Sequence, residues 1–492
     1  MRSALGPLGP VVAHAGVSAG EWLGVLGERA PLVLEPSNES GWFSGVQLVA
    51  VDPVRSGTFG RGAARLSAVG AVLQQAFDSR EPVVAAAMVP YSGEPTFAVF
   101  SGGLILAVDG WRTWGTLLPD DLPVPLPLSE ILPRPLMVDA HSDVDGAGFE
   151  GRVEEVREAI RRGDVYVLNL TRMVSGCAVA DHSAIFRSLL AGTPASMAAA
   201  WSAGDSWLAS ASPERFVGVR GHEVYVEPVK GTRPRSGDAE TDAALRDELA
   251  NSLKERAEHV MIVDLERNDL GRACVAGSIE VDPLFRVEST AYCHQAVSHV
   301  CGLLRPESTL GDLLAATFPC GSITGAPKIA AMRIIDELEV SARGAYTGSL
   351  LVAIPGALDS SVLIRTIEGR GDRVTYGTGC GITIDSDARE EWAESVLKTE
   401  PVLGPMPSGA LRETCRVVAT AVPLWRLHRE RLRAGGCGEE LLDRVDAVVR
   451  DALASAGGRT DAFRLTVIVT PEGAVRAVVS AQRSSQWRRL AR

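Results

Sequence analysis

The stretch "SWLASASPERFVGVRGHEVYVEPVK" at residues 206–230 decides how the chain folds. It alternates short apolar runs with Gly, Pro and charged residues, which is typical of consecutive β-strands with no helix between them. A helical pattern follows only afterwards, near 239–263, and other helices are predicted near 147–162 and 327–341. Strands and helices are interleaved here without a regular βαβ period. This order favours an α+β fold over a doubly wound parallel sheet.

Two proline-rich seams divide the chain. Proline lacks an amide donor and fixes φ, so "LPDDLPVPLPLSEILPRP" (118–135) and "PVLGPMPSGA" (401–410) are neither helix interiors nor central strands. In the first part of the chain, apolar runs separated by turns predict antiparallel strands and a helix near 61–77. The predicted regions are an N-terminal region at 1–135, a central region at 136–403 and a C-terminal segment at 404–492.

The composition is typical of a globular protein. Hydrophobic residues make up 46% and charged residues 22% of the 492 positions. The net charge of −12 argues against nucleic acid or an anionic membrane as the main partner, but not against a small anionic substrate in a basic pocket. The eight cysteines form no C-x-x-C pair and no cluster with the spacing of a zinc site. No apolar run approaches the roughly 20 residues of a membrane-spanning helix. The first residues lack the pattern of a secretory signal. We therefore expect free thiols and a cytoplasmic protein.

Lysine is rare in this chain, and the opening stretch ends on one. Of the 49 basic residues only four are lysines, at positions 230, 254, 328 and 398. Arginine supplies a fixed charge but does not readily lose a proton to become a nucleophile. Arg233 and Arg235 follow Lys230 closely, and neighbouring cations with partial burial favour the uncharged, nucleophilic amine. The alternative is a plain surface lysine.

A carboxylate precedes Lys230 by sixteen residues. Glu214, in "ASPERF", stands at the end of a predicted strand. A glutamate in that position can serve as a general acid, and a surface glutamate is the alternative. Lys230 and Glu214 are therefore the candidates for catalysis.

Two predicted helices each carry a pair of glutamates three residues apart. These are Glu255 and Glu258 in "KERAEH", and Glu391 and Glu394 in "DAREEWAESVLK". The spacing places the two carboxylates of each pair on one helix face. Magnesium takes one or two protein carboxylates and fills its other positions with water and substrate oxygens. Convergence of the two helices predicts a magnesium site, and solvated helix faces are the alternative.

Two glycine-containing segments offer backbone donors. "FPCGSITGAPK" (318–328) lacks the spacing of a nucleotide phosphate loop. Pro327 suits a first helical position, which places 322–326 at a helix N-terminus, where free N–H groups attract anions. "YGTGCGIT" (376–383) carries alternate glycines whose amides can face a carboxylate. Ordinary glycine turns are the alternative in both places.

Together these segments resemble the chorismate-utilising enzymes, which include component I of anthranilate synthase, component I of aminodeoxychorismate synthase, isochorismate synthase and salicylate synthase. The matching motifs follow the family's order over about 145–400: "GDVYVLNLTR", "ASPERF", "EPVKGTRPR", "KERAEHVMIVDLERNDLGR", "GSITGAPK", "RGAYTGSL", "SSVLIRT" and "GTGCGITIDSDAREEWAESVLK". The resemblance implies two opposed antiparallel β-sheets flanked by helices, with the substrate site between them.

The resemblance also implies roles for single residues. Glu214 matches the general acid that helps the C4 hydroxyl of chorismate to leave, and the metal is implied to hold the ring carboxylate. Tyr346 and Arg365 match positions that hold the enolpyruvyl carboxylate. The implied magnesium ligands are Glu258 and Glu394, with Glu255 and Glu391 nearby and partly through water. The implied substrate-binding residues are Thr232, Thr324, Tyr346, Arg365, Gly379, Gly381 and Lys398.

Two positions distinguish the subfamilies. Anthranilate synthases have P-I-A-G-T where this chain has "PVKGT", and Lys230 resembles the lysine that, in aminodeoxychorismate synthase, attacks C2 of chorismate and leaves when ammonia enters at C4. Isochorismate and salicylate synthases activate water with a lysine in the segment that matches "DVYVLNLTR". The matching position here is Val167, which takes no proton, although this segment also lacks the glutamine common in amine-using relatives. The resemblance favours aminodeoxychorismate synthase component I over two alternatives, anthranilate synthase component I and a catalytically inactive assembly or regulatory subunit.

The ammonia source and the C-terminal segment complete the expectations. None of the eight cysteines lies in a G-x-C-x-G glutaminase motif, so the implied partner is a separate glutamine amidotransferase subunit. The segment that begins "LRETCRVVATAVPLWRLHRERLRAGG" resembles the N-terminal part of aminodeoxychorismate lyase, a pyridoxal-phosphate enzyme. Residues 399–492 contain no lysine, so no Schiff base to that cofactor can form there. We therefore expect a truncated, non-catalytic segment that serves as a docking surface.

Overall fold

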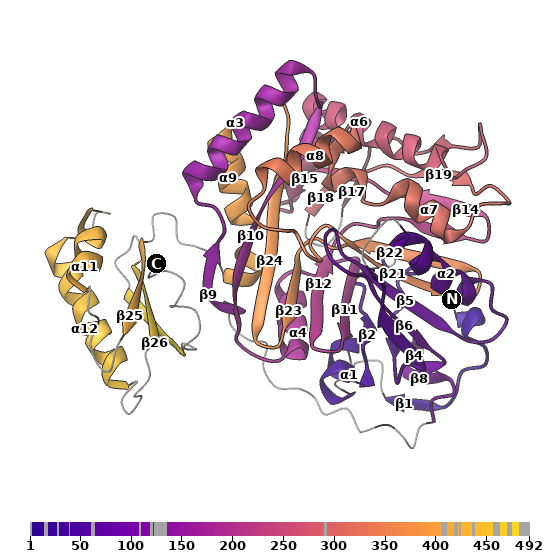
Figure 1. The fold of residues 1–492 in the computed structure, drawn as a ribbon, viewed down its shortest axis with the longest axis horizontal. Coiled ribbons are helices and arrows are strands. Elements are labelled where there is room, and N and C mark those ends of the chain that lie inside the picture. The colour runs from indigo at the N-terminus through magenta and orange to yellow at the C-terminus, as the bar shows by residue number, and fades with distance from the viewer. Residues whose placement is uncertain are drawn as a thin grey trace.

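The protein is described by a computed structural model. The described residues are 2–13, 18–26, 29–38, 40–60, 64–107, 110–118, 122, 135–289, 293–404, 411–417, 422, 425–434, 438–455, 463–469 and 475–481. Two large β-sheets face each other and helices cover their outer faces (Figure 1). All pairings between named strands are antiparallel, which confirms the predicted α+β class.

Sheet I is the larger sheet and has twelve strands. Because β2 pairs with β11, strands from both sides of the 118–135 seam share this sheet. Its order is β1 (Val11–Ala13), β8 (Gly110–Gly115), β7 (Gly102–Ala107), β3 (Leu48–Ala50), β2 (Leu32–Leu34), β11 (Met197–Ala203), β12 (Ser206–Ser212), β23 (Thr366–Arg370), β24 (Arg373–Ile382), β10 (Val167–Ala178) and β20 (Gly325–Ala326), with β9 (Met137–Ser142) beside β10.

Sheet II has nine strands and also joins the two regions, through the pairing of β5 with β21. Its order is β16 (Glu280–Val281), β19 (Val300–Leu303), β14 (Glu223–Val226), β13 (Gly218–Arg220), β22 (Ala357–Val362), β21 (Ser349–Ile354), β5 (Val84–Val89), β6 (Thr96–Phe100) and β4 (Arg55–Thr58). The inner faces of sheets I and II meet in one apolar core that includes Leu34, Trp201, Phe100 and Val352. Burial of these side chains drives the two sheets together.

The stretch at 206–230 crosses from one sheet to the other. Its first strand, β12, belongs to sheet I, whereas β13 and β14 belong to sheet II. The predicted run of strands without an intervening helix is confirmed. The crossing carries Glu214, and the chain continues into β15 (Val229–Pro234), which carries Lys230.

Helices cover the outer faces of the sheets in three groups. On sheet II lie α2 (Arg65–Phe77) and α7 (Leu310–Thr317). On one end of sheet I lie α1 (Ala19–Leu26), α4 (His182–Gly192) and the short α10 (Glu400–Leu403). Over β10 and β24 lie α3 (Gly146–Arg162), α8 (Lys328–Leu338) and α9 (Ala388–Leu397) (Figure 1). No described helix has the length and apolar character needed to cross a membrane.

Three predicted boundaries need correction. The single helix predicted near 239–263 is two helices, α5 (Ala239–Asn251) and α6 (Leu253–Gly271), because Ser252 leaves helical geometry and its Oγ accepts the Glu255 N–H at 3.3 Å as an N-cap. α8 begins at Lys328, so Pro327 precedes the helix as its N-cap instead of occupying its first position. Pro401, in the second seam, lies in the first turn of α10, where proline is tolerated.

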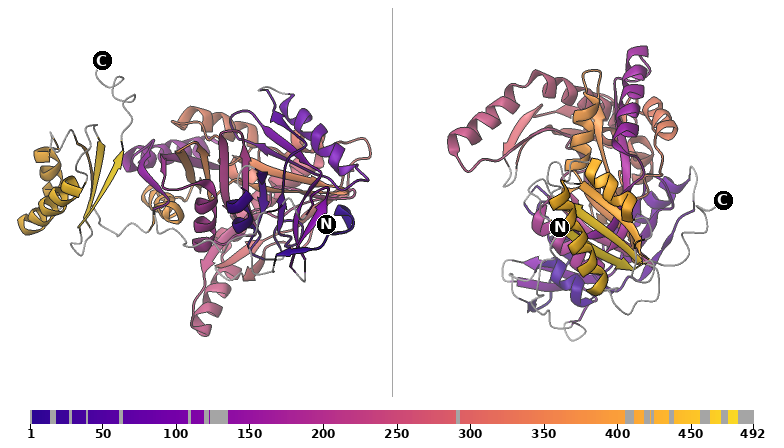
Figure 2. Two further views of the ribbon diagram at one scale, coloured as in Figure 1. Left: turned by 90° about the horizontal axis from the view of Figure 1, so that it is seen from below. Right: turned by 90° about the vertical axis from the view of Figure 1, so that its left-hand side faces the viewer.

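A small third sheet projects from the body of the fold. Sheet III consists of β15, β18 (Cys293–Val297) and β17 (Arg286–Ser289), and α5 packs on it. Leu249, Phe285 and Ala296 form a separate core between the helix and the sheet. Figure 2 shows this unit, in pink, extending beyond the two large sheets.

The C-terminal segment has its own sheet and core. Strands β25 (Leu411–Val417), β26 (Phe463–Val469) and β27 (Val475–Ala481) form sheet IV, and α11 (Trp425–Ala434) and α12 (Glu439–Ser455) accompany it. Leu432, Leu442 and Val467 are among its buried apolar residues. The described part of this segment is thus a small α/β unit.

Candidate active site

β24 has one open edge. Its pairing with β23 ends at Tyr376, whereas its pairing with β10 continues to Ile382. In an antiparallel ladder, the backbone groups of alternate residues point to the same neighbour. The carbonyl of Gly379 accepts the Lys398 amine at 2.8 Å, so the backbone groups of Gly377, Gly379 and Gly381 point away from β10, toward the open edge. Among the described residues no strand pairs with this edge, so the N–H of Gly381 is available to a ligand.

Tyr346 explains why one of these positions is glycine. A methyl group built on Gly377 would lie 2.1 Å from Cγ of Tyr346, so only glycine lets the ring pack against the strand. The ring is buried, and burial raises the pKa of its hydroxyl. Tyr346 therefore keeps its proton and packs on the face of β24 at Gly377.

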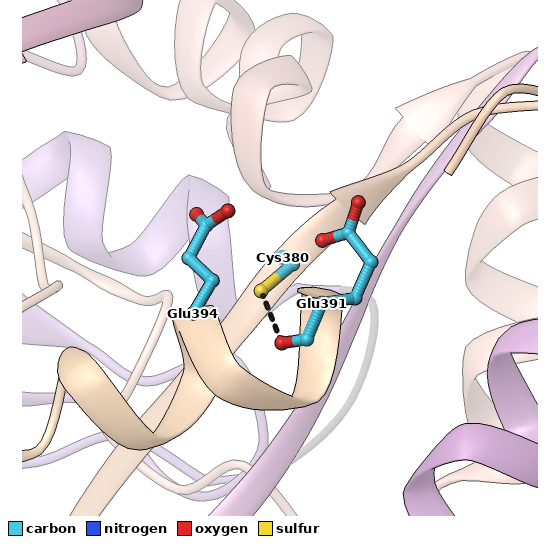
Figure 3. A group of neighbouring side chains, drawn as sticks. All are labelled: Cys380, Glu391 and Glu394. Atoms are coloured by element: carbon cyan, nitrogen blue, oxygen red, sulfur yellow. Dashed lines mark hydrogen bonds between the residues drawn. The ribbon is translucent and has the colours of Figure 1, made fainter. Parts of the chain in front are cut away.

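Helix α9 places acidic side chains beside the same strand. It starts at the N-cap Asp387 and runs back along β24, where Thr378 Oγ1 donates to the Ser395 carbonyl at 2.9 Å and Cys380 Sγ donates to the Glu391 carbonyl at 3.3 Å. One carboxylate oxygen each of Glu391 and Glu394 and the Cys380 sulfur lie within 4.8 Å of one another (Figure 3). Burial, and then the neighbouring Glu394, raises the pKa of Glu391.

This donor set fits a hard divalent cation. Two carboxylates on adjacent turns of one helix are what magnesium takes from a protein, and its remaining positions go to water and substrate oxygens. Glu394 also pairs with Lys398 at 2.6 Å, so the acidic group is locally balanced before a cation binds. Burial raises the pKa of the Cys380 thiol, so this sulfur stays protonated beside the carboxylates.

The other predicted pair lies on the first two turns of α6. Glu255 receives a hydrogen bond from Arg233 Nη1 at 3.3 Å, and both Glu255 and Glu258 are partly buried. In the described part of the chain, these carboxylates do not join Glu391 and Glu394 in one group with ligand atoms within 4.8 Å. The four acids thus flank the site from two helices without forming one cluster.

The Lys230 amine comes from sheet III and lies beside the end of β24. A methyl group built on Gly381 would lie 3.8 Å from Lys230 Nζ and 4.0 Å from Cγ2 of Val167. The amine, the end of β24 and Val167 therefore meet at one place. A β-bulge at Gly231, with φ of +79°, follows the lysine, and a side chain there would meet Leu249 and Glu255.

The two arginines near Lys230 are occupied by acids. Arg233 pairs with Glu248 at 3.0 Å, besides its contact with Glu255, and Arg235 pairs with Asp242 at 2.9 Å. Each of the two guanidinium charges is thus balanced by a nearby carboxylate.

His259, which sequence reasoning missed, lies on α6 behind the amine. It is fully buried, with Nε2 and Ser298 Oγ 2.6 Å apart. Burial, and then the charges of Lys230 and Arg256, lower the pKa of His259 to about 4, so the imidazole is neutral at neutral pH. Its position directly after Glu258 was the only signal in the sequence.

Glu214 is buried where the chain crosses between the sheets. Ser322 Oγ donates to Glu214 Oε1 at 2.5 Å. Burial raises the pKa of Glu214, and the Ser322 hydrogen bond and the Lys230 charge oppose this to a smaller extent. The environment therefore favours a protonated carboxyl that can donate.

A second buried acid lies behind Glu214. Burial, and then the Glu214 charge, raises the pKa of Glu266 on α6 to about 8. Cys320 Sγ contacts Glu266 Oε1 at 3.5 Å, and Lys328 donates to Asp269 and, at 2.7 Å, to the Thr317 carbonyl. A small cavity of about 10 Å³ lies here, lined by Phe216, Val226, Glu266, Asp269, Leu270, Thr317, Cys320 and Gly321.

Three remaining predicted residues differ in their surroundings. Arg365 is exposed, has φ of +49° and lies in the crossing from β22 to β23, where its carbonyl accepts the Ala211 N–H at 3.0 Å. Thr232 is exposed on β15. Thr324 is fully buried and its hydroxyl donates to the carbonyls of Cys320 and Gly321, so it fixes the loop.

The loop at 322–326 does not present a free helix N-terminus. Gly321–Ile323 form a 3₁₀ turn, and Gly325–Ala326 pair with β10 as β20. The Ala326 carbonyl also accepts the Tyr166 N–H at 2.7 Å. The predicted anion cradle is therefore a paired segment, and its contribution to the site is the Ser322 hydroxyl.

The fold and this arrangement define a class of protein. Residues 125–404 match the family described as chorismate binding enzyme, which is more than half of the chain. The chain belongs to this family. In solved structures, anthranilate synthase component I from Streptococcus pneumoniae aligns with a TM-score of 0.62 at 28% identity, over 73% of this chain and 92% of that one. The menaquinone-specific isochorismate synthase of Escherichia coli aligns at 0.65 and 16% identity, over 79% of this chain and 92% of that one, which shows the shared fold.

Curated relatives are more specific. An aminodeoxychorismate synthase from Streptomyces griseus is 41% identical over 261 residues, which cover 53% of this chain and 36% of that protein. Aminodeoxychorismate synthase component 1 from Salmonella typhimurium is 38% identical over 266 residues, 54% of this chain and 59% of that protein. Anthranilate synthase component 1 1 from Haloarcula marismortui is 39% identical over 258 residues, 52% of this chain and 53% of that protein. The matched part of the chain thus spans between about a third and three fifths of these relatives.

Proposed function

We propose that the protein aminates chorismate at C4 to give 4-amino-4-deoxychorismate, with Lys230 as a nucleophile. The observation that carries this proposal is the position of the Lys230 amine beside Gly381, close enough to Glu214 for their charges to interact. Val167 lies at the same place and offers no base for activating water. The relatives named aminodeoxychorismate synthase support the same reading.

The proposed chemistry uses two side chains in sequence. The uncharged Lys230 amine forms a bond to C2 of chorismate, the two ring double bonds shift, and the C4–O bond breaks as Glu214 gives its proton to the leaving oxygen. Ammonia then bonds to C4, the double bonds shift back and Lys230 leaves C2. Burial of Glu214 supports this role because it raises the pKa of the acid.

Magnesium is the proposed cofactor, and its role would be to balance the charge of the ring carboxylate. We assign Glu258 and Glu394 as ligands, with Glu255 and Glu391 nearby and partly through water. The closeness of Glu391 to Glu394 supports half of this set directly.

The open edge of β24 is the proposed carboxylate-binding wall. Gly379 and Gly381 supply backbone groups there, and Lys398 already bonds to the Gly379 carbonyl. Tyr346 and Arg365 are assigned to the enolpyruvyl carboxylate, and Thr232 faces the substrate from sheet III. Thr324 contributes by holding the loop, since its hydroxyl is bonded to backbone carbonyls.

Ammonia is proposed to come from a separate glutamine amidotransferase subunit in the cytoplasm, as a step toward para-aminobenzoate and folate. The sequence supports this because none of its eight cysteines lies in a glutaminase elbow. The segment 404–492 is the proposed docking surface, because it has its own core and no lysine for pyridoxal phosphate. The free cysteines among the described residues suit a reducing compartment.

The deciding experiment is mass spectrometry of the products formed from chorismate, magnesium and ammonium salts. The wild type is expected to give 4-amino-4-deoxychorismate, and Lys230→Ala to lose at least about 100-fold of this rate, the lower range of what a positioned catalytic group contributes. Lys230→Arg is the matched control, because it keeps the charge and removes the nucleophile, and it should fail as well. Activity of Lys230→Arg near the wild-type rate would show that the residue acts only through charge.

Two further outcomes separate the alternatives. Anthranilate with loss of the enolpyruvyl group would identify an anthranilate synthase, which a relative in Haloarcula marismortui is named for. No product under saturating magnesium and ammonium would identify an inactive subunit. Activity of the purified chain with glutamine alone would contradict the proposed partner.

A further inference from the structure

A chain of contacts connects Glu214 to the second buried acid. Ser322 Oγ donates to Glu214 Oε1 at 2.5 Å. Ser322 Oγ also lies 3.3 Å from Cys320 Sγ. The sulfur in turn lies 3.5 Å from Glu266 Oε1. All four side chains are buried. Two largely buried carboxyls are thus joined through a hydroxyl and a thiol.

Three elements hold this chain of contacts in place. Glu214 follows β12, Glu266 lies on α6, and Cys320 and Ser322 lie on the turn between α7 and β20. Gly321, between the two bridging residues, packs so closely on α6 that an added methyl group would lie 2.7 Å from Leu265 Cδ2. The bridge is therefore pressed onto the helix that carries Glu266.

Burial raises the pKa of both acids, and their charges are coupled. Ionised Glu214 raises the pKa of Glu266 further, because like charges in a buried site oppose each other, and Lys328 opposes this only partly. When Glu214 gives up its proton, Glu266 therefore still holds one. Such a pair of coupled acids separates the roles of donor and store.

Glu266 also has a route for renewing its proton. It lines the small cavity of about 10 Å³ together with Asp269 and Thr317. A cavity of this size holds about one water molecule, and the polar groups around it can bind that water and exchange protons with it. Glu214 has no described contact with this cavity except through Ser322 and Cys320.

We propose that Glu266 stores the proton that recharges Glu214, and that Cys320 and Ser322 pass it on. This inference rests on the role of Glu214 as the general acid proposed above. The Glu266 hydroxyl proton moves to Cys320 Sγ, the thiol proton moves to Ser322 Oγ, and the hydroxyl proton moves to Glu214 Oε1. Glu266 remains as a carboxylate and takes a proton from water in the cavity, so protons balance and no electrons change hands. Ser322 and Cys320 are positioning residues that never touch the substrate.

The kinetic test compares two substitutions at one position. Cys320→Ala interrupts the path, whereas Cys320→Ser replaces the thiol with another group that both donates and accepts. We expect Cys320→Ala and Glu266→Gln to lower kcat for amination at least about tenfold, within the range that a general acid contributes, with KM for chorismate nearly unchanged. Cys320→Ser should restore most of the loss. The measurements cover pH 6–9, a range around the Glu266 pKa of about 8. If both Cys320→Ala and Glu266→Gln keep the wild-type kcat throughout this range, the relay is overturned.

A spectroscopic test does not depend on turnover. Infrared spectroscopy detects the carbonyl stretch of a protonated buried carboxyl. The band that is lost in Glu266→Gln belongs to Glu266, and in the wild type it should titrate near pH 8. Glu214→Gln removes the neighbouring charge, so the midpoint should fall, whereas an uncoupled Glu266 would keep its midpoint and refute the inference. A coupled titration in a protein that forms no aminated product would leave the acid pair standing and reject the proposed function. Formation of the aminated product together with an uncoupled titration would reject the relay and leave the proposed function standing.

Discussion

Replacement of Arg343 by alanine should be among the most destabilising single changes in the protein. The arginine is 1% exposed and its ion-pair partner Glu339 is 6% exposed, with 2.7 Å between Nη2 and Oε1. The guanidinium also donates to the carbonyls of Ile323 at 2.9 Å and Asn169 at 2.7 Å. It stacks over the Tyr91 ring at 4.6 Å. One side chain thus joins α8, β10 and the turn that carries Ser322.

The expected loss of stability follows from the buried groups that the substitution leaves without a partner. Glu339 would keep its two hydrogen bonds from Thr171 but lose its buried counter-charge, and two carbonyls would lose a donor. Removal of one partner of a buried ion pair costs about 3–5 kcal/mol, because the remaining charge stays desolvated. This is a large share of the roughly 5–15 kcal/mol by which proteins are stable.

The assay is equilibrium unfolding in urea, with Arg161→Ala as the matched control. Arg161 pairs with Glu158 at 3.0 Å, but the two side chains are 46% and 53% exposed. Exposed pairs contribute about 0–1 kcal/mol, so the control should barely change the free energy of unfolding. The double variant Arg343→Met/Glu339→Gln should recover part of the loss, since no charge is left unpaired. Equal destabilisation by Arg343→Ala and Arg161→Ala would refute the reasoning.

Two other predictions concern protons and metal. Glu266 has a pKa of about 8 in the folded protein, against 4.5 ordinarily. Between pH 4.5 and pH 8 the folded state therefore binds one more proton than the unfolded state. As the pH rises through this range, the free energy of unfolding falls by about 1.4 kcal/mol per pH unit. Glu266→Gln should remove this contribution to the slope, measured by urea unfolding at pH 6, 7 and 8; an unchanged slope would mean that Glu266 is ionised in the folded protein. Removal of magnesium with a chelator should abolish amination. The free energy of unfolding should fall by only about 1.4 kcal/mol when the starting magnesium concentration is ten times Kd. The effect on folding is small because the acids already have partners in Lys398 and Arg233. A protein that unfolds on chelation would show that the metal is structural.

Local patterns in the sequence were sufficient for the elements of the fold. The alternation of apolar and polar residues in 206–230 foresaw successive strands, and the i,i+3 spacing foresaw that Glu391 and Glu394 share a helix face. The break at Ser252 was missed because a helical pattern on both sides hides a single capping residue. That serine, three residues before Glu255, was nevertheless a usable N-cap signal.

The contacts within the site were beyond such patterns. Ser322 and Glu214 are 108 residues apart, and Cys320 and Glu266 are 54 apart, so only the crossing between the sheets brings them together. The open edge of β24 depends on where β23 ends, which no property of β24 itself reveals. Arg233 is a further example, because its closeness in sequence to Lys230 gave no sign of its pairing with Glu248 and Glu255.

The separate core of sheet III has an evolutionary consequence. Lys230 stands on a unit packed around Leu249 and Phe285, whereas Val167 stands on the large scaffold of sheet I. In evolution, the proposed nucleophile at position 230 and a base at position 167 can therefore be exchanged separately, because the two positions lie on different sheets.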